Sequence, residues 1–234
     1  ELAATTAVRI EQMGPALESI AELRAPVGVL QRGVQMLTRV RAAIPPDQGA
    51  PGTTSQVAGS MAQANEDYKY VGFEDQFRGS GAAIHERLRV YVPLFAGCAD
   101  VLDLGCGGGE VLAALETAGV SARGVDVNGE MVAAARERGL DASQSDALRY
   151  VAALPDASLG GVVATQVIEH LEPSYLMRLL DTLSHKLRQG APVVIETINP
   201  ACWLAFFSSY IRDFTHVRPV HPETLQYLLR ASGF

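Results

Sequence analysis

Cysteine, positive charge and long apolar runs are all scarce in this chain of 234 residues. The three cysteines form no CxxC pair, which argues against a disulfide framework or a structural zinc site and fits a reducing compartment. Acidic residues (26) outnumber lysine and arginine (19), so the net charge of −7 argues against a broad nucleic-acid-binding face. No apolar run reaches the roughly 18 residues of a membrane span. No signal-peptide pattern is recognisable, and a cytoplasmic location is therefore expected.

Apolar residues make up 48% of the chain, which indicates one folded core with an appendage. We expect a helical segment over 1–44, a Pro-, Gly- and Ser-rich linker over 45–65, and a domain that carries the chemistry over 66–234. Apolar residues from Val27 to Leu37 alternate at spacings of three and four. Two interpretations stay open for this helix: packing on its own domain, or docking that forms a homodimer.

Short β-branched strands alternate with helical patterns from residue 80 onward. This alternation predicts an α/β fold with a doubly wound, mostly parallel, Rossmann-like sheet. Strands are expected at 100–104, 122–127, 140–144, 161–166 and 192–197, and helices at 82–92, 110–118, 129–138, 173–188 and 222–231. Because such sheets usually continue with more strands, we expect further strands beyond Phe234.

A glycine-rich run, VLDLGCGGGE over 101–110, leads from an expected strand into a helix. Glycine allows a sharp turn and close approach of a ligand to the backbone, and the helix N-terminus behind it offers N–H groups. No lysine follows in the position that a P-loop requires. A dinucleotide fingerprint would need glycine where Glu110 stands. The remaining interpretation is a ligand with an amino-acid end and a nucleoside end.

The run DLGCGGG (103–109) resembles motif I of the class I S-adenosylmethionine-dependent methyltransferases. GVDVN (124–128) and SDA (145–147) resemble motifs II and III of this family, in the same order. TQVIEHL (165–171) resembles its segment after the fourth strand, and LRQG (187–190) resembles its turn before the fifth. Several motifs in sequence order make the resemblance specific.

The resemblance implies that Asp126 accepts hydrogen bonds from the ribose hydroxyls and that Asp146 contacts the adenine amino group. Taken alone, either aspartate could instead cap a helix or turn. Arg78 is expected to bind the methionine carboxylate, whereas Met131 could pack on adenine or fill the core. The residues assigned to the cofactor are Arg78, Asp103, Gly105, Cys106, Gly107, Asp126, Val127, Met131, Asp146, Ala147 and Gln166.

A second group of segments resembles bacterial methyltransferase domains associated with cell-surface polysaccharide and O-antigen biosynthesis. These are FEDQFRG (73–79), ETINP (196–200), DFTHVRP (213–219) and HPETL (221–225). This resemblance implies an acceptor that is a glycan, a glycan phosphate or a related small molecule, methylated on oxygen.

His170 and His216 are the candidate bases, because a hydroxyl acceptor must lose its proton. Arg212 and Arg218 add positive charge that would suit an anionic acceptor. Glu169 and His170 with a distant histidine also resemble the ExxEH…H arrangement of some metal-dependent O-methyltransferases. Gln166 replaces the first acid of that pattern, so a divalent metal is the less favoured alternative and no metal ligand is assigned.

Two other functions were weighed against this one. A catalytically silent cofactor-fold module could dock a partner through residues 1–44. A nicotinamide oxidoreductase is disfavoured by Glu110, whose charge would oppose a pyrophosphate.

Overall fold

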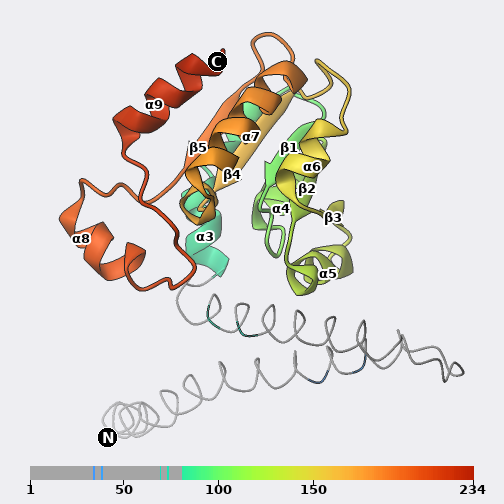
Figure 1. Ribbon diagram of the computed structural model, residues 1–234. Coiled ribbons are helices and arrows are strands. Elements are labelled where there is room, and N and C mark those ends of the chain that lie inside the picture. The colour runs from blue at the N-terminus through green and yellow to red at the C-terminus, as the bar shows by residue number, and fades with distance from the viewer. Residues whose placement is uncertain (1–33, 35–37, 39–68, 70–72, 74–80) are drawn as a thin grey trace, which may run out of the picture. The chain divides into compact units, whose positions relative to one another are not determined.

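The computed structural model describes residues 34, 38, 69, 73 and 81–234 of the chain (Figure 1). Its contacts divide the chain into two units, Glu1–Gly79 and Ser80–Phe234. Val34 and Thr38 are helical, and the Thr38 hydroxyl donates to the Val34 carbonyl at 2.8 Å. The rest of the expected N-terminal helix, the linker and Arg78 lie outside the described residues. Within the described part, no helix is long and apolar enough to cross a bilayer.

A five-stranded sheet forms the centre of the second unit, in the order β3-β2-β1-β4-β5. Every pairing is parallel, which confirms the predicted doubly wound α/β fold. The strands are β1 (Val101–Leu104), β2 (Ala122–Asp126), β3 (Ala142–Gln144), β4 (Gly161–Thr165) and β5 (Val193–Glu196). Because all strands point the same way, the loops that follow β1, β2 and β4 leave the sheet at one edge.

Helices cover both faces of the sheet. Leu102 and Leu104 of β1 pack with α6 (Ala147–Ala152) and α7 (Pro173–Lys186), whereas Val101 packs with Leu115 of α4 (Glu110–Thr117) and with Phe95. All four residues of β1 are buried, as expected for a central parallel strand. The other described helices are α3 (Gly81–Leu88), α4 (Glu110–Thr117), α5 (Gly129–Glu137), α8 (Trp203–Ala205) and α9 (Pro222–Ala231), with 3-10 turns η1 (Val92–Phe95) and η2 (Ile168–His170) and the π-helix η3 (Phe206–Tyr210).

The structure departs from the expected elements in a few places. α6 was not predicted, because its six residues are too few to show a helical period; Asp146 starts it by accepting from the Arg149 N–H. The helix expected over 82–92 ends at Leu88. The segment after β5, for which no helix was predicted, forms α8 and η3.

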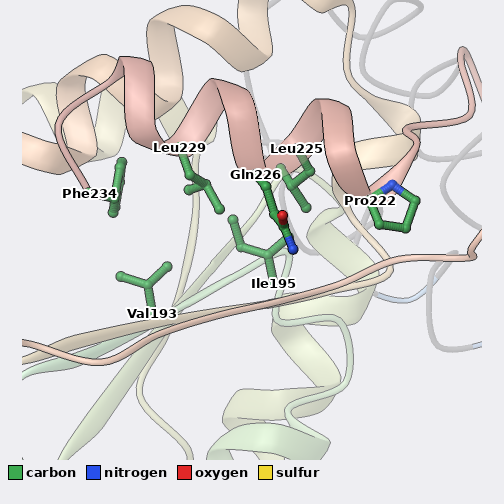
Figure 2. A pocket seen from close by; sticks show the side chains of 7 residues that line it. All are labelled: Val193, Ile195, Pro222, Leu225, Gln226, Leu229 and Phe234. Carbon is green, nitrogen blue, oxygen red and sulfur yellow. The ribbon is translucent and has the colours of Figure 1, made fainter.

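α9 lies along β5, the strand at one edge of the sheet (Figure 2). Between them is an open apolar pocket of about 410 Å³. Its lining consists of Val193, Ile195, Pro222, Leu225, Gln226, Leu229 and Phe234. None of these seven side chains is ionisable, so the pocket offers no acid, base or nucleophile and is not the candidate for chemistry.

Candidate active site

The glycine turn after β1 requires glycine for two separate reasons. Gly105, Gly107 and Gly109 have φ values of 65°, 51° and 84°, a left-handed conformation that other residues adopt at a cost. A Cβ on Gly105 would lie 2.5 Å from Cγ2 of Val167, and one on Gly109 would lie 2.4 Å from Cδ1 of Leu140. The turn is therefore packed tightly against the segment that follows β4.

Asp126 links the glycine turn to the end of β2. Its Oδ2 accepts from the Gly107 N–H at 2.9 Å, and its Oδ1 accepts from the Asn128 N–H at 2.8 Å. Asn128 in turn caps α5 by accepting from the N–H groups of Glu130 and Met131. Val127, which follows Asp126 in the chain, is 66% exposed. A carboxylate and an exposed apolar side chain thus lie side by side at the carboxyl edge of the sheet.

Four of the predicted cofactor residues are buried, Gly107 of the turn among them. Asp103, Cys106 and Met131 are 1%, 3% and 7% exposed. The Cys106 side chain lies in the core, where a Cβ on Gly124 would meet its sulfur at 2.6 Å. Burial, followed by the charges of Asp103 and Asp126, raises the pKa of the Cys106 thiol. The buried Cys106 thiol therefore stays protonated near pH 7.

Asp146 caps α6 and also binds a tyrosine from α7. Its Oδ1 accepts from the Arg149 N–H at 2.8 Å, and its Oδ2 accepts from the Tyr175 hydroxyl at 2.7 Å. The Tyr175 oxygen accepts from the Leu148 N–H at 2.8 Å. Burial is the largest cause that raises the pKa of Tyr175 to about 12, so the tyrosine stays a donor. Ala147 is the first residue of α6 and is half-buried. Sequence analysis missed Tyr175, because only the packing of α6 on α7 brings it here.

Gln166 directly follows β4 and has a left-handed conformation, with φ of 58°. Its backbone N–H donates to the Glu196 carbonyl at 2.8 Å, and its Nε2 donates to Glu196 Oε1 at 2.9 Å. Glu196 also accepts from the Tyr91 hydroxyl at 2.6 Å and lies 3.5 Å from the Arg87 guanidinium. A left-handed non-glycine residue costs about 1–3 kcal/mol. These contacts hold Gln166 in that conformation at the carboxyl edge of the sheet.

The structure brings the two predicted bases together. The rings of His170, in η2, and His216 have centroids 4.6 Å apart. His170 Nδ1 lies 2.9 Å from the Thr215 hydroxyl, and His216 Nδ1 lies 2.7 Å from the Tyr210 carbonyl. The His216 ring also stacks on Tyr210. Burial, followed by the charge of His216, lowers the pKa of His170, so its neutral form dominates near pH 7.

Glu169 lies beside the histidines and is fully buried. Its backbone carbonyl accepts from the N–H groups of Val217 and Arg218. Both of its carboxylate oxygens are buried without a hydrogen-bond partner among the described residues. The Thr197 hydroxyl is close enough to lower the Glu169 pKa but lies outside hydrogen-bond geometry. Burial outweighs this effect and raises the pKa of Glu169.

Glu169, His170 and His216 could together hold a metal ion, because one ligand atom from each lies within 4.8 Å of the others. Two imidazoles and one carboxylate suit zinc or another transition metal better than magnesium. A buried carboxylate that finds no hydrogen-bond partner in the described part of the chain also fits a cation. Gln166 stands in place of the first acid of the ExxEH…H pattern, and its side chain is hydrogen-bonded to Glu196.

The arginines expected to add positive charge lie at the surface. Arg212 and Arg218 are exposed, whereas the His216 side chain is only 5% exposed. The three residues therefore do not form one buried anion site.

Comparison with known proteins decides the family. Residues 68–234 match a family model described as a methyltransferase domain. A crystal structure of an S-adenosylmethionine-dependent methyltransferase from Archaeoglobus fulgidus is 42% identical, with a TM-score of 0.68 over 70% of this chain and 74% of that one. The chain belongs to the S-adenosylmethionine-dependent methyltransferase family.

Two further proteins resemble this methyltransferase at lower identity. A ubiquinone biosynthesis O-methyltransferase from Xylella fastidiosa is 29% identical over 135 residues, which cover 55% of this chain and 53% of that protein. The chain thus spans about half the length of the curated relatives it matches. A phosphoethanolamine N-methyltransferase from Haemonchus contortus, solved with S-adenosylmethionine, shares the fold at 21% identity and a TM-score of 0.50, over 62% of this chain and 36% of that one. Membership in class I is confirmed, and the likeness to polysaccharide enzymes stays a prediction.

Proposed function

We propose that this methyltransferase binds S-adenosylmethionine at the glycine turn and transfers the methyl group to an oxygen of an acceptor held beside His170. The ribose hydroxyls would donate to Asp126, and the adenine amino group to Asp146. Val127 offers the exposed apolar surface on which adenine would pack. Asp103 is buried in β1, two residues before Gly105, and the Gly107 N–H donates to Asp126.

One observation carries the proposal: the glycine turn packs against the segment that leads to the histidines. A Cβ on Gly105 would collide with the Val167 side chain. The backbone N–H of His170 donates to the backbone carbonyl of Val167 at 3.0 Å. The cofactor half and the acceptor half of the site are therefore contiguous. This proximity is what a direct transfer between two bound reactants requires.

The chemistry favours a hydroxyl acceptor. The cofactor supplies a methyl group on a sulfonium, which an oxygen nucleophile displaces. A hydroxyl is a weak nucleophile until its proton is removed, whereas a phosphate oxygen is already anionic and needs mainly positioning. A half-buried, neutral His170 beside a second histidine provides the base that a hydroxyl needs.

For the acceptor we favour a hydroxyl of a glycan, a glycan phosphate or a related small molecule. The likeness of residues 196–200 and 213–219 to polysaccharide-associated enzymes supports the glycan. The O-methyltransferase from Xylella fastidiosa supports transfer to oxygen. The exposed Arg212 and Arg218 could contact an anionic group on such an acceptor from the surface.

Calorimetry of the full chain with S-adenosylmethionine and with S-adenosylhomocysteine tests the cofactor half. Absence of binding at millimolar ligand would favour the silent docking module instead. Transfer of an isotope-labelled methyl group to a panel of free sugars, sugar phosphates and a catechol tests the acceptor half. Label found in a nitrogen or sulfur acceptor, and in none of these hydroxyl compounds, would contradict transfer to oxygen.

Glu169, His170 and His216 favour a metal-assisted form of the same transfer as the second candidate. Treatment with a chelator separates the two forms. If a bound cation activates the hydroxyl, activity should fall at least tenfold and return on addition of Zn²⁺ or Mn²⁺. Full activity after exhaustive chelation would leave His170 as the base.

A further inference from the structure

The loop after η3 places a threonine between an aspartate and His170. Thr215 Oγ1 lies 2.6 Å from Asp213 Oδ1 and 2.9 Å from His170 Nδ1. The Thr215 backbone N–H donates to the same Asp213 oxygen at 2.9 Å, which fixes the loop around the carboxylate. None of these loop contacts was expected from the sequence.

The hydrogens in this chain of contacts can be assigned in only one way. A threonine hydroxyl carries a single hydrogen, and an ionised carboxylate can only accept. The Thr215 hydrogen therefore points to Asp213, and the Thr215 oxygen can only accept from His170. It follows that Nδ1 of His170 carries a hydrogen and that, in the neutral ring, Nε2 carries the lone pair.

His216 provides an independent parallel. Its Nδ1 lies 2.7 Å from the Tyr210 carbonyl, which can only accept. Tyr210 ends η3, where backbone carbonyls lack partners within the helix. The Nδ1 atoms of both imidazoles are thus held by partners from one short stretch of the chain, and His216 Nε2 lies 3.8 Å from Asp213 Oδ2.

We propose that Asp213 and Thr215 are positioning residues that hold His170 in its Nδ1–H tautomer, so that Nε2 is the atom that accepts the proton of the acceptor hydroxyl. This proposal rests on the proposed function. As the new oxygen–carbon bond forms, the carbon–sulfur bond breaks and its electron pair stays on sulfur. The hydroxyl proton goes to His170 Nε2, and the positive charge passes from the sulfonium to the imidazolium.

Nitrogen-15 NMR of the full chain, labelled at histidine, measures the tautomer without any acceptor. Protonated and unprotonated ring nitrogens have well-separated shifts, and the spectrum of His170→Gln assigns the His170 signals. We expect a protonated Nδ1 and an unprotonated Nε2 in the unmodified protein. A predominant Nε2–H form there would overturn the proposal, even if every variant failed to fold.

Two variants test the hydroxyl itself. Thr215→Val keeps the shape of the side chain but removes its hydroxyl. This variant should shift His170 toward the Nε2–H form that free histidine prefers. Thr215→Ser retains a hydroxyl and should keep the original tautomer. Thr182→Val is the matched control, because the Thr182 hydroxyl donates to the Arg178 carbonyl within its own helix, α7, at 2.7 Å. An unchanged tautomer in Thr215→Val would contradict the role of Thr215.

Binding and turnover separate this proposal from the proposed function. Thr215→Val should leave the Kd for S-adenosylhomocysteine unchanged and lower kcat about tenfold, a fraction of the effect of a lost base. Loss of cofactor binding by the unmodified protein would refute the proposed function while the NMR result still stands. An unchanged kcat in a variant whose tautomer has shifted would refute the catalytic part of the inference.

Discussion

The proposed cofactor half and the proposed acceptor half of this site are built in different ways. The cofactor half consists of two turns at adjacent strand ends, where backbone N–H groups and the carboxylate of Asp126 form the contacts. The acceptor half consists of side chains from η2 and from the loop after η3, which contact one another through His170, Thr215 and His216. Backbone geometry is set locally by glycine and strand ends, whereas converging side chains depend on how distant segments pack.

This comparison predicts that substitutions in the two halves have separable effects. The largest should come from His170→Gln, which removes the base without changing the cofactor half. Turnover should fall about 10²–10⁴-fold, the usual contribution of a general base. The Kd for S-adenosylmethionine should change less than threefold. Loss of cofactor affinity in parallel with turnover would show that the halves are not separate.

Gly105→Ala should cost about 2–4 kcal/mol in total, shared between the free energy of cofactor binding and the free energy of unfolding. The causes are backbone strain and the collision of the new Cβ with Val167. Calorimetry with S-adenosylhomocysteine measures the loss in binding, and thermal unfolding measures the loss in stability. Gly119→Ala is the matched control, because Gly119 has a φ of 75° but nothing within 4 Å of its Cβ position. Equal losses in the two variants would mean that strain alone matters and that the contact with Val167 does not.

Asp126→Ala should weaken cofactor binding by about 1–3 kcal/mol, because hydrogen bonds to a charged group are lost. Asp156→Ala removes an exposed carboxylate that pairs with Lys186, and should leave binding unchanged. Equal affinity in Asp126→Ala and the unmodified protein would refute the ribose role.

Tyr175→Phe should have the smallest effect, about 0.5–1.5 kcal/mol in cofactor affinity, since it removes one hydrogen bond that orients Asp146. The comparison of S-adenosylmethionine with an analogue that lacks the adenine amino group sharpens this prediction. Tyr175→Phe should lose affinity for S-adenosylmethionine but lose little for the analogue. An equal loss for both ligands would place the effect in the packing of α6 on α7.

The sequence predicted the strands and the order of motifs well, because short β-branched runs and glycine turns are local signals. It also placed His170 and His216 on the acceptor side without showing that their rings would lie 4.6 Å apart. Tyr175 could not be found in this way, and neither could the contacts of Thr215 and Glu196, although both residues lie in segments that the sequence singled out. Each acts through a partner far along the chain or through a donor geometry that spacing does not reveal.

The amino-acid sequence by itself determined the parallel α/β fold, the glycine turn and the position of Asp126, since these follow from backbone conformation and strand order. Only the tertiary structure decided that a buried Glu169 lies within ligand distance of two histidines and that Asp213 reaches His170 through Thr215. The physical reason is that hydrogen-bond direction and burial depend on packing between segments distant in sequence, whereas turns and strands depend on their own residues.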